Sequence, residues 1–271
     1  MMDPLFSCEP VCEGVTRINL PCAVCAYYLE GSRRGLLIDT GYGYGDLKGF
    51  VGGLATQPYD VALTHGHVDH AGGAAQFGRV YMSQRDLPVA EIHTELAFRA
   101  DYLRRSGVSD LLPELMVPMR PIDTYDDLVD GQRFDLGGLT ATFLALPGHT
   151  PGSMVAHIPE RSAMLFGDAV NSATYLQFPE ASPLEEYRQA LRAFDDEWGG
   201  SYDRALFSHP HNIGGPGLLA EMVGLLDTIV ADPSRGMDVS VFLGEGVRVA
   251  KPVNESLMPV DGTTANFFYR V

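Results

Sequence analysis

The sequence predicts an α/β protein in which two β-sheets pack face to face and helices cover the outside. The chain has 271 residues and is 45% hydrophobic, which is enough to fill one large core. Short apolar or alternating runs recur in both halves, as is typical of strands. Two segments with helix-start signals carry apolar residues on one side. No long linker interrupts this pattern, so we predict a single domain over 1–271.

The first half of the chain is predicted to form most of one sheet. Apolar runs bounded by turn residues indicate the strands, and Glu30-Gly31-Ser32 marks one of the turns. The predicted elements are, in order, strands over 15–20, 23–30 and 34–38, a helix over 46–55, and strands over 60–64 and 79–82.

A helix and a loop are predicted to form a lid-like insertion over about 83–121. Ser83-x-x-Asp86 is a helix-start signal, and Gly107 is a helix stop. Between them, apolar residues at helical spacing suggest one face, namely Ile92, Leu96, Ala100 and Leu103. The following segment, 108–121, has three prolines and no periodicity, so it is predicted to be a loop.

The second half resembles the first in outline. A hairpin is predicted at 134–139, followed by strands over 140–146, 154–158, 163–166 and 202–207. Ser182-Pro183-x-Glu185 is a capping box that begins a helix with an apolar stripe. His157 falls in the middle of a strand, which favours a core histidine, whereas His93 is expected to be exposed to solvent on the lid helix.

Polar side chains follow the ends of several predicted strands. These residues are Asp39, His65, His149, Asp168 and His209. In two face-to-face sheets such strand ends gather along one edge, where ligand sites form. The sequence therefore predicts one site at that edge.

The hexapeptide His65-Gly66-His67-Val68-Asp69-His70 is the strongest chemical signal in the chain. It follows a buried strand and places four metal-ligand side chains within six residues. Imidazoles and a carboxylate crowded together are costly to bury unless a cation compensates them. His65 and His67 can reach one ion, while Asp69 and His70 project toward a neighbouring one. Mixed nitrogen and oxygen ligands favour zinc, with Mn²⁺ or Fe²⁺ as alternatives.

With the Gly-His turn at His149, Asp168 and His209, this hexapeptide resembles the metallo-β-lactamase superfamily. The run Leu36-Leu37-Ile38-Asp39-Thr40-Gly41 matches that family's first motif, and the resemblance covers about 15–212. It implies a four-layer αββα sandwich of two mixed sheets around a dinuclear centre. In that centre one ion is held by His65, His67 and His149, the second by Asp69, His70 and His209, and Asp168 bridges them.

A dinuclear centre predicts a hydrolase that needs no side-chain nucleophile. Two ions share a water, lower its pKa and make it a hydroxide that attacks a carbonyl. Asp69 and Asp168 are the predicted catalytic carboxylates, and Tyr175 is a candidate donor to the oxyanion. Asp39 is predicted to orient a ligand from outside the centre. Tyr42 and Tyr44 are candidates to line the entrance.

Two questions stay open at this point. Either His209 or His211 provides the last ligand, and we favour His209 because it directly follows Ser208 at the strand end. The reaction is the second question, because one fold serves many reactions. Aspartate at position 168 resembles the glyoxalase-II-like and lactonase-like branches, which predicts a small-molecule ester, lactone or thioester as substrate. The alternatives are a mononuclear iron oxygenase of the persulfide-dioxygenase kind, which uses His65, His149 and Asp168, and a non-catalytic binding protein.

The charge of the chain limits its partners. Nineteen basic residues face 35 acidic ones, giving a net charge of −16, which disfavours nucleic acid and anionic membranes. The N-terminus lacks a signal-peptide pattern and there is no long apolar run, so we expect a cytoplasmic protein. A homodimer is plausible. Cys22 and Cys25 are predicted to lie in a strand over 21–29 as small hydrophobic residues.

Overall fold

A seven-stranded mixed sheet forms the first half of the molecule. The computed structural model describes residues 5–105, 112–209, 213–241 and 244–270. The strands of this sheet lie in chain order, and the pairing changes from antiparallel to parallel after β4. They are β1 (Ser7–Cys12), β2 (Val15–Leu20), β3 (Val24–Glu30), β4 (Gly35–Ile38), β5 (Tyr59–Ala62), β6 (Val80–Met82) and β7 (Asp126–Asp127).

A six-stranded sheet faces the first one, in the order β14-β13-β11-β10-β9-β8. Among the described residues of this sheet, β11 and β13 are the only parallel neighbours. Its strands are β8 (Gln132–Asp135), β9 (Thr140–Ala145), β10 (Met154–Ile158), β11 (Ala163–Gly167), β13 (Arg204–Phe207) and β14 (Ile213–Gly214).

A third, four-stranded sheet was not predicted from the sequence. Its order is β12-β17-β16-β15, and it joins a short strand near the site to strands close to the C-terminus. The strands are β12 (Thr174–Tyr175), β15 (Met237–Val241), β16 (Gly244–Val249) and β17 (Phe267–Arg270).

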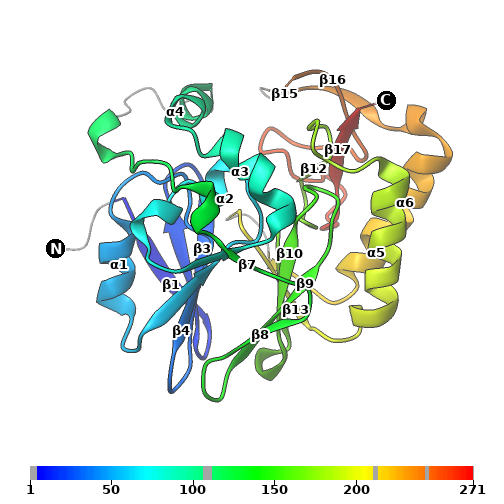
Figure 1. The fold of residues 1–271 in the computed structure, drawn as a ribbon. Coiled ribbons are helices and arrows are strands. Elements are labelled where there is room, and N and C mark those ends of the chain that lie inside the picture. The colour runs from blue at the N-terminus through cyan, green and yellow to red at the C-terminus, as the bar shows by residue number, and fades with distance from the viewer. Residues whose placement is uncertain (1–4, 106–111, 210–212, 242–243, 271) are drawn as a thin grey trace.

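Helices cover the outer faces of the two large sheets (Figure 1). The helices are α1 (Leu47–Leu54), α2 (Val68–Ala71), α3 (Leu87–His93), α4 (Leu96–Arg105), α5 (Leu184–Trp198) and α6 (Leu218–Ala231). Buried apolar side chains form one layer between α1 and the first sheet and one between the two sheets. A third layer lies between the second sheet and α5 with α6. The predicted αββα sandwich is therefore confirmed.

The lid segment differs from the single predicted helix. After a 3₁₀ turn, α3 ends at His93 and α4 begins at Leu96. Ile92 and Leu96 are 59% and 45% exposed, so they do not form the predicted buried stripe. The buried residues of α4 are Leu103, which belongs to that stripe, and Arg99, whose guanidinium donates to the carbonyls of Tyr42, Gly72 and Val117. Three carbonyl acceptors compensate the burial of this charged group.

The N-terminal cysteines lie in different environments. The strand predicted to begin at Pro21 begins only at Val24, because Cys22 and Ala23 have φ angles of 65° and 57° and form a turn. Cys25 is buried in β3, as predicted, whereas Cys22 lies outside the strand. None of the helices in the described ranges has the length and apolar character needed to cross a bilayer.

Candidate metal centre

The hexapeptide turns sharply between β5 and α2. His65 and Gly66 follow the strand, and His67 precedes the first residue of α2, which carries Asp69 and His70. A side chain at Gly66 would lie 2.7 Å from the carbonyl oxygen of Asp86, so this close approach requires glycine. The turn therefore presents four donor side chains within one short segment.

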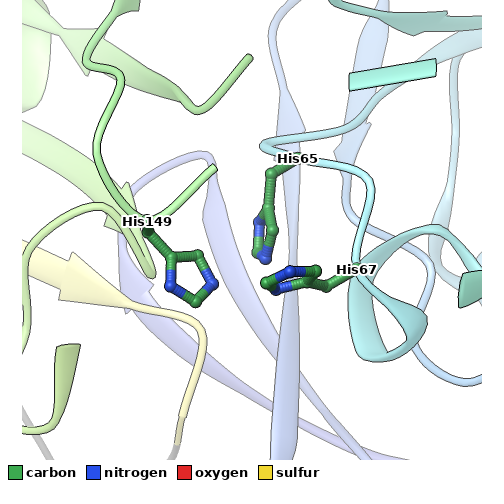
Figure 2. Close-up of side chains that lie close together, drawn as sticks. All are labelled: His65, His67 and His149. Carbon is green, nitrogen blue, oxygen red and sulfur yellow. The ribbon is translucent and has the colours of Figure 1, made fainter. Parts of the chain in front are cut away.

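The histidines of this turn meet a histidine from the second half of the chain. One donor atom each of His65, His67 and His149 lies within 4.8 Å of the others, and all three residues are buried. Figure 2 shows the three rings turned toward one another, those of His65 and His67 from one loop and that of His149 from another. We call these residues the first ligand group.

A second ligand group lies beside the first and contains Asp69, His70, Asp168 and His209. Oδ2 of Asp168 lies 3.1 Å from Nε2 of His209 and 3.4 Å from Nε2 of His70. The same oxygen lies 3.9 Å from Nε2 of His149, which belongs to the first group. Asp168 therefore lies between the two groups. Residue 211, the alternative to His209, is outside the described residues.

One ring nitrogen of each of these histidines is already engaged. Nδ1 of His65 lies 3.0 Å from Oγ1 of Thr64, and Nδ1 of His149 lies 2.7 Å from the Tyr175 carbonyl. Nδ1 of His209 similarly lies 3.0 Å from the Ala23 carbonyl. Such contacts fix the orientation of the ring and its tautomer, which leaves the other ring nitrogen available to bind a metal ion.

The free nitrogens fit a divalent cation. Nε2 of His65, His70 and His149 is buried and has no hydrogen-bond partner among the described residues. Buried polar atoms without partners are costly, and a cation among them removes that cost. Imidazole nitrogens together with carboxylate oxygens form a donor set typical of zinc, and Mn²⁺ or Fe²⁺ also accept it.

Charges within the centre shift the pKa values in opposite directions. Burial and the neighbouring imidazoles hold the pKa of His65 and His67 well below the usual range. Burial also opposes the charge on His70, but nearby carboxylates, Asp69 foremost, raise its pKa well above that range. Asp168 similarly overcomes burial and raises the pKa of His209 to about 9. His65 and His67 are thus kept neutral, whereas His70 and His209 favour the charged form beside carboxylates.

Two aspartates outside the groups hold the ligand loops in place. Asp39, which is 1% exposed, accepts hydrogen bonds from the backbone and hydroxyl of Thr64 and contacts Nδ1 of His70 at 2.9 Å. Asp86 is fully buried and accepts from the backbone N–H groups of Gly66 and Gly152 and from the Thr150 hydroxyl. Asp86 therefore joins the loop of His65 to that of His149.

Sequence reasoning missed Asp86 and also Glu180 as parts of this site. Asp86 stood out only as part of a helix-start signal, and its two backbone partners lie 20 and 66 residues away. Glu180 lies in no motif, yet its Oε1 is 2.8 Å from Nε2 of His67. His93 was expected to be solvated, but its side chain is only 14% exposed and stacks on His67.

A cavity of about 430 Å³ opens beside the two ligand groups. Tyr42 and Tyr175 lie in its wall. Tyr44 does not belong to the described lining, because its hydroxyl accepts from the backbone of Leu112 and it pairs with the segment around Met116. The other large apolar or aromatic residues of the wall include Tyr102, Phe178, Phe207, Leu257 and Met258.

His157 lies apart from the ligand groups. It belongs to β10 and is 9% exposed. Its Nε2 lies 3.2 Å from the Ser201 carbonyl, and its ring contacts Trp198 edge to face. It is the core histidine that its position in the strand predicts.

Several curated proteins are similar to parts of this chain. Acyl-coenzyme A thioesterase MBLAC2 from Homo sapiens is 25% identical over 176 residues, covering 59% of this chain and 63% of that protein. An atrochrysone carboxyl ACP thioesterase from Aspergillus fumigatus is 27% identical over 172 residues, covering 61% and 45%. Hydroxyacylglutathione hydrolase from Hyphomonas neptunium is 32% identical over 107 residues, covering 40% and 32%. The chain spans less than two thirds of the length of each of these relatives.

Solved structures share the fold at lower identity. The sec-alkylsulfatase Pisa1 from Pseudomonas sp. matches with a TM-score of 0.64 and 16% identity over 86% of this chain and 44% of its own. A metallo-beta-lactamase from Pontibacter korlensis matches with a TM-score of 0.58 and 18% identity over 82% of this chain and 99% of its own. The family model of the metallo-beta-lactamase superfamily matches residues 20–209, a range that contains both ligand groups. This chain therefore belongs to the metallo-beta-lactamase superfamily.

Proposed function

We propose that this chain is a metal-dependent hydrolase that cleaves an ester, lactone or thioester bond next to an uncharged acyl group. One observation carries the proposal: both ligand groups border a single cavity whose walls are largely aromatic and aliphatic. The relatives named as thioesterases and as a hydroxyacylglutathione hydrolase support hydrolysis of such bonds.

The ligand groups divide naturally between two ions. His65, His67 and His149 would hold one ion, Asp69, His70 and His209 the other, with Asp168 between them. Such ions would supply Lewis acidity, which lowers the pKa of bound water so that hydroxide is available at neutral pH. Zinc is the ion we propose, because the donors are mostly imidazoles.

Two residues of the cavity are suited to act on the substrate directly. Asp168 can accept a hydrogen bond from the attacking water and so hold it in line with the carbonyl. Burial, together with Asp168 and Asp69, raises the pKa of Tyr175 to about 12, so its hydroxyl keeps its proton and can donate to the developing oxyanion.

Cys22 also lies in the cavity wall but is a poor candidate for a nucleophile. Burial and the nearby Asp69 raise the pKa of its thiol to about 11. A thiol attacks as its thiolate, and little thiolate forms at neutral pH when the pKa is this high. Water activated at the centre is therefore the nucleophile that we propose.

The charge of the cavity favours an uncharged acyl group. Among the described residues that line it there is no lysine and no arginine, whereas Asp69 and Asp168 are present. Carboxylates and phosphates are usually held by arginine or lysine, so an anionic acyl group would find no basic side chain to pair with in this wall. A charged carrier attached to the acyl group would have to lie outside the cavity.

Metal analysis and a substrate panel test this proposal. Protein purified without added metal is analysed for metal content and then assayed on esters, lactones and thioesters whose acyl groups are either neutral or carboxylated. We expect two zinc ions per chain and faster hydrolysis of the neutral member of each matched pair. One iron per chain with oxygen uptake would indicate the oxygenase instead, and metal-loaded protein that cleaves nothing in the panel would contradict hydrolysis.

A further inference from the structure

A carboxylate and a second histidine surround the outer edge of His67. Oε1 of Glu180 lies 2.8 Å from Nε2 of His67 and 3.5 Å from Nε2 of His93. The rings of His67 and His93 stack, with centroids 4.6 Å apart and an angle of 22° between the planes. The three side chains are 6%, 14% and 18% exposed, in the order His67, His93, Glu180. They therefore form a compact and mostly buried cluster next to the first ligand group.

The ring nitrogen of His67 that contacts a neighbouring residue is not the one used by His65 and His149. His65 and His149 are engaged at Nδ1 and leave Nε2 free. In His67 the nitrogen next to Glu180 is Nε2. An imidazole that donates its Nε2 proton to a carboxylate carries its lone pair on Nδ1, which is the nitrogen it can then offer to an ion. Without Glu180, either tautomer of His67 would be available.

We propose that Glu180 and His93 are positioning residues for His67. Glu180 accepts the Nε2 proton of His67 and so fixes the tautomer that presents Nδ1 to the first ligand group. His93, the last residue of α3, lies 3.5 Å from the same carboxylate oxygen and covers one face of the His67 ring. This inference rests on the proposed role of His67 as a metal ligand.

The cluster is too tight to be a separate metal site. His67, His93 and Glu180 do offer donor atoms within 4.8 Å of one another. Two ligands of a tetrahedral zinc ion, with bonds of about 2.0 to 2.2 Å, lie about 3.3 to 3.6 Å apart. The separation of 2.8 Å between His67 and Glu180 is instead that of a hydrogen bond with a charged acceptor.

The arrangement also links two distant segments to the centre. His93 comes from the lid segment of the first half, and Glu180 comes from the turn before α5 in the second half. Phe178, near Glu180 in the chain, contacts the rings of both His67 and His149. The tautomer of one ligand is thus set by residues that the two halves of the chain contribute together.

Zinc affinity measured on metal-free protein tests this inference without an activity assay. Competition with a chromophoric chelator gives the dissociation constant and the number of zinc ions for wild type, Glu180→Ala and Glu180→Gln. We expect Glu180→Ala to weaken one zinc site by about 10- to 100-fold with unchanged stoichiometry at saturation. Glu180→Gln keeps an oxygen acceptor and should recover most of the affinity. His93→Ala should weaken the same site by a smaller factor.

Glu197→Ala is the matched control, since Glu197 is an exposed carboxylate on α5. Circular dichroism of each metal-free variant shows that the fold is retained. Wild-type zinc affinity in Glu180→Ala would overturn the positioning role. It would also be overturned if wild type bound three zinc ions per chain and Glu180→Ala bound two, because the cluster would then be a metal site itself. If wild type binds zinc as expected but hydrolyses nothing, the proposed function fails and this inference stands. If wild type binds no zinc, both fail.

Discussion

The two ligand groups of the centre differ in charge. The first contains three imidazoles, and the second combines two imidazoles with two carboxylates. Burial and neighbouring histidines lower the pKa of His65 and His67, whereas carboxylates overcome burial and raise the pKa of His70 and His209. The second group therefore pairs opposite charges within the protein. The free nitrogens of the first group are left to a cation.

This difference has consequences for the metal-free protein. In the second group, His209 and Asp168 contact each other at 3.1 Å. In the first group, Nε2 of His65 and of His149 has no hydrogen-bond partner among the described residues; Nε2 of His70 in the second group has none either, but it lies 3.4 Å from the Asp168 carboxylate. We therefore expect the first group to depend more strongly on its cation. Asp168, which approaches both groups, should be the most sensitive position.

Asp168→Ala should have the largest effect because it removes the carboxylate that joins the groups. We expect turnover to fall on the order of 10³-fold or more, which corresponds to about 4 kcal/mol of lost transition-state stabilisation. Steady-state kinetics on the best substrate of the panel measures this. Asp196→Ala, an exposed aspartate on α5, is the control and should leave turnover unchanged. Turnover within a factor of ten of wild type in Asp168→Ala would break the bridging role.

His67→Ala tests the first group alone. We expect zinc content to fall from about two ions per chain to about one and turnover to fall by about 10²-fold or more, because the second group keeps its own ligands. His157→Ala is the matched histidine control. It should retain metal and activity and lose about 1 kcal/mol of unfolding free energy with its hydrogen bond to Ser201. If His157→Ala loses metal and His67→Ala does not, the ligand assignments are wrong.

Asp39→Asn tests the second group through a residue that supports it from outside. The amide keeps the shape of the side chain but is a weaker acceptor for Nδ1 of His70 and for Thr64. We expect the affinity for the second zinc ion to fall by about 10- to 100-fold, while the first ion is bound as in wild type. Zinc titration of the metal-free variant separates the two ions. Equal weakening of both would remove the distinction between the groups.

The sequence could predict the layers of the fold and the residues at the strand ends. Apolar runs of strand length place Asp39, His65 and Asp168 directly after strands, and strands of stacked sheets end along shared edges. The third sheet was missed for two reasons. β12 has only two residues, too few for a local pattern, so its pairing with a distant strand defines it. Met237–Val241 does alternate apolar and polar residues, and this strand signal was missed.

Local sequence patterns also could not identify the residues that support the centre. Glu180 contacts a residue 113 positions away, and Arg99 of α4 is buried because three carbonyls from other loops surround it. A charged residue on a helix is normally exposed, so its sequence context predicts the opposite. Tyr44 was misplaced for a similar reason, since its contact with Leu112 arises from a loop of another segment.

An ion pair away from the metal centre should give the smallest of these effects when it is removed, and Glu221→Gln tests this. Glu221 of α6 accepts from Nζ of Lys251 and from the backbone of Ala265. Burial tends to raise the pKa of Glu221, but these hydrogen bonds outweigh it and hold the pKa below the usual 4.5. A lowered pKa in the folded state favours the charged form, so this stabilisation is fully present above about pH 4.5.

As pH falls below that value, the unfolded chain takes up the proton first, and the stabilisation is lost as pH passes through the lowered pKa of the folded state. Glu221→Gln should therefore lose at most about 1 kcal/mol at neutral pH, because the pair is partly exposed. Its unfolding free energy should also decline less steeply than that of wild type below pH 4.5. Denaturant unfolding from pH 7 to pH 3 measures both effects, with Glu197→Gln as the exposed control. Parallel curves for wild type and Glu221→Gln would mean that this pair does not contribute to acid sensitivity.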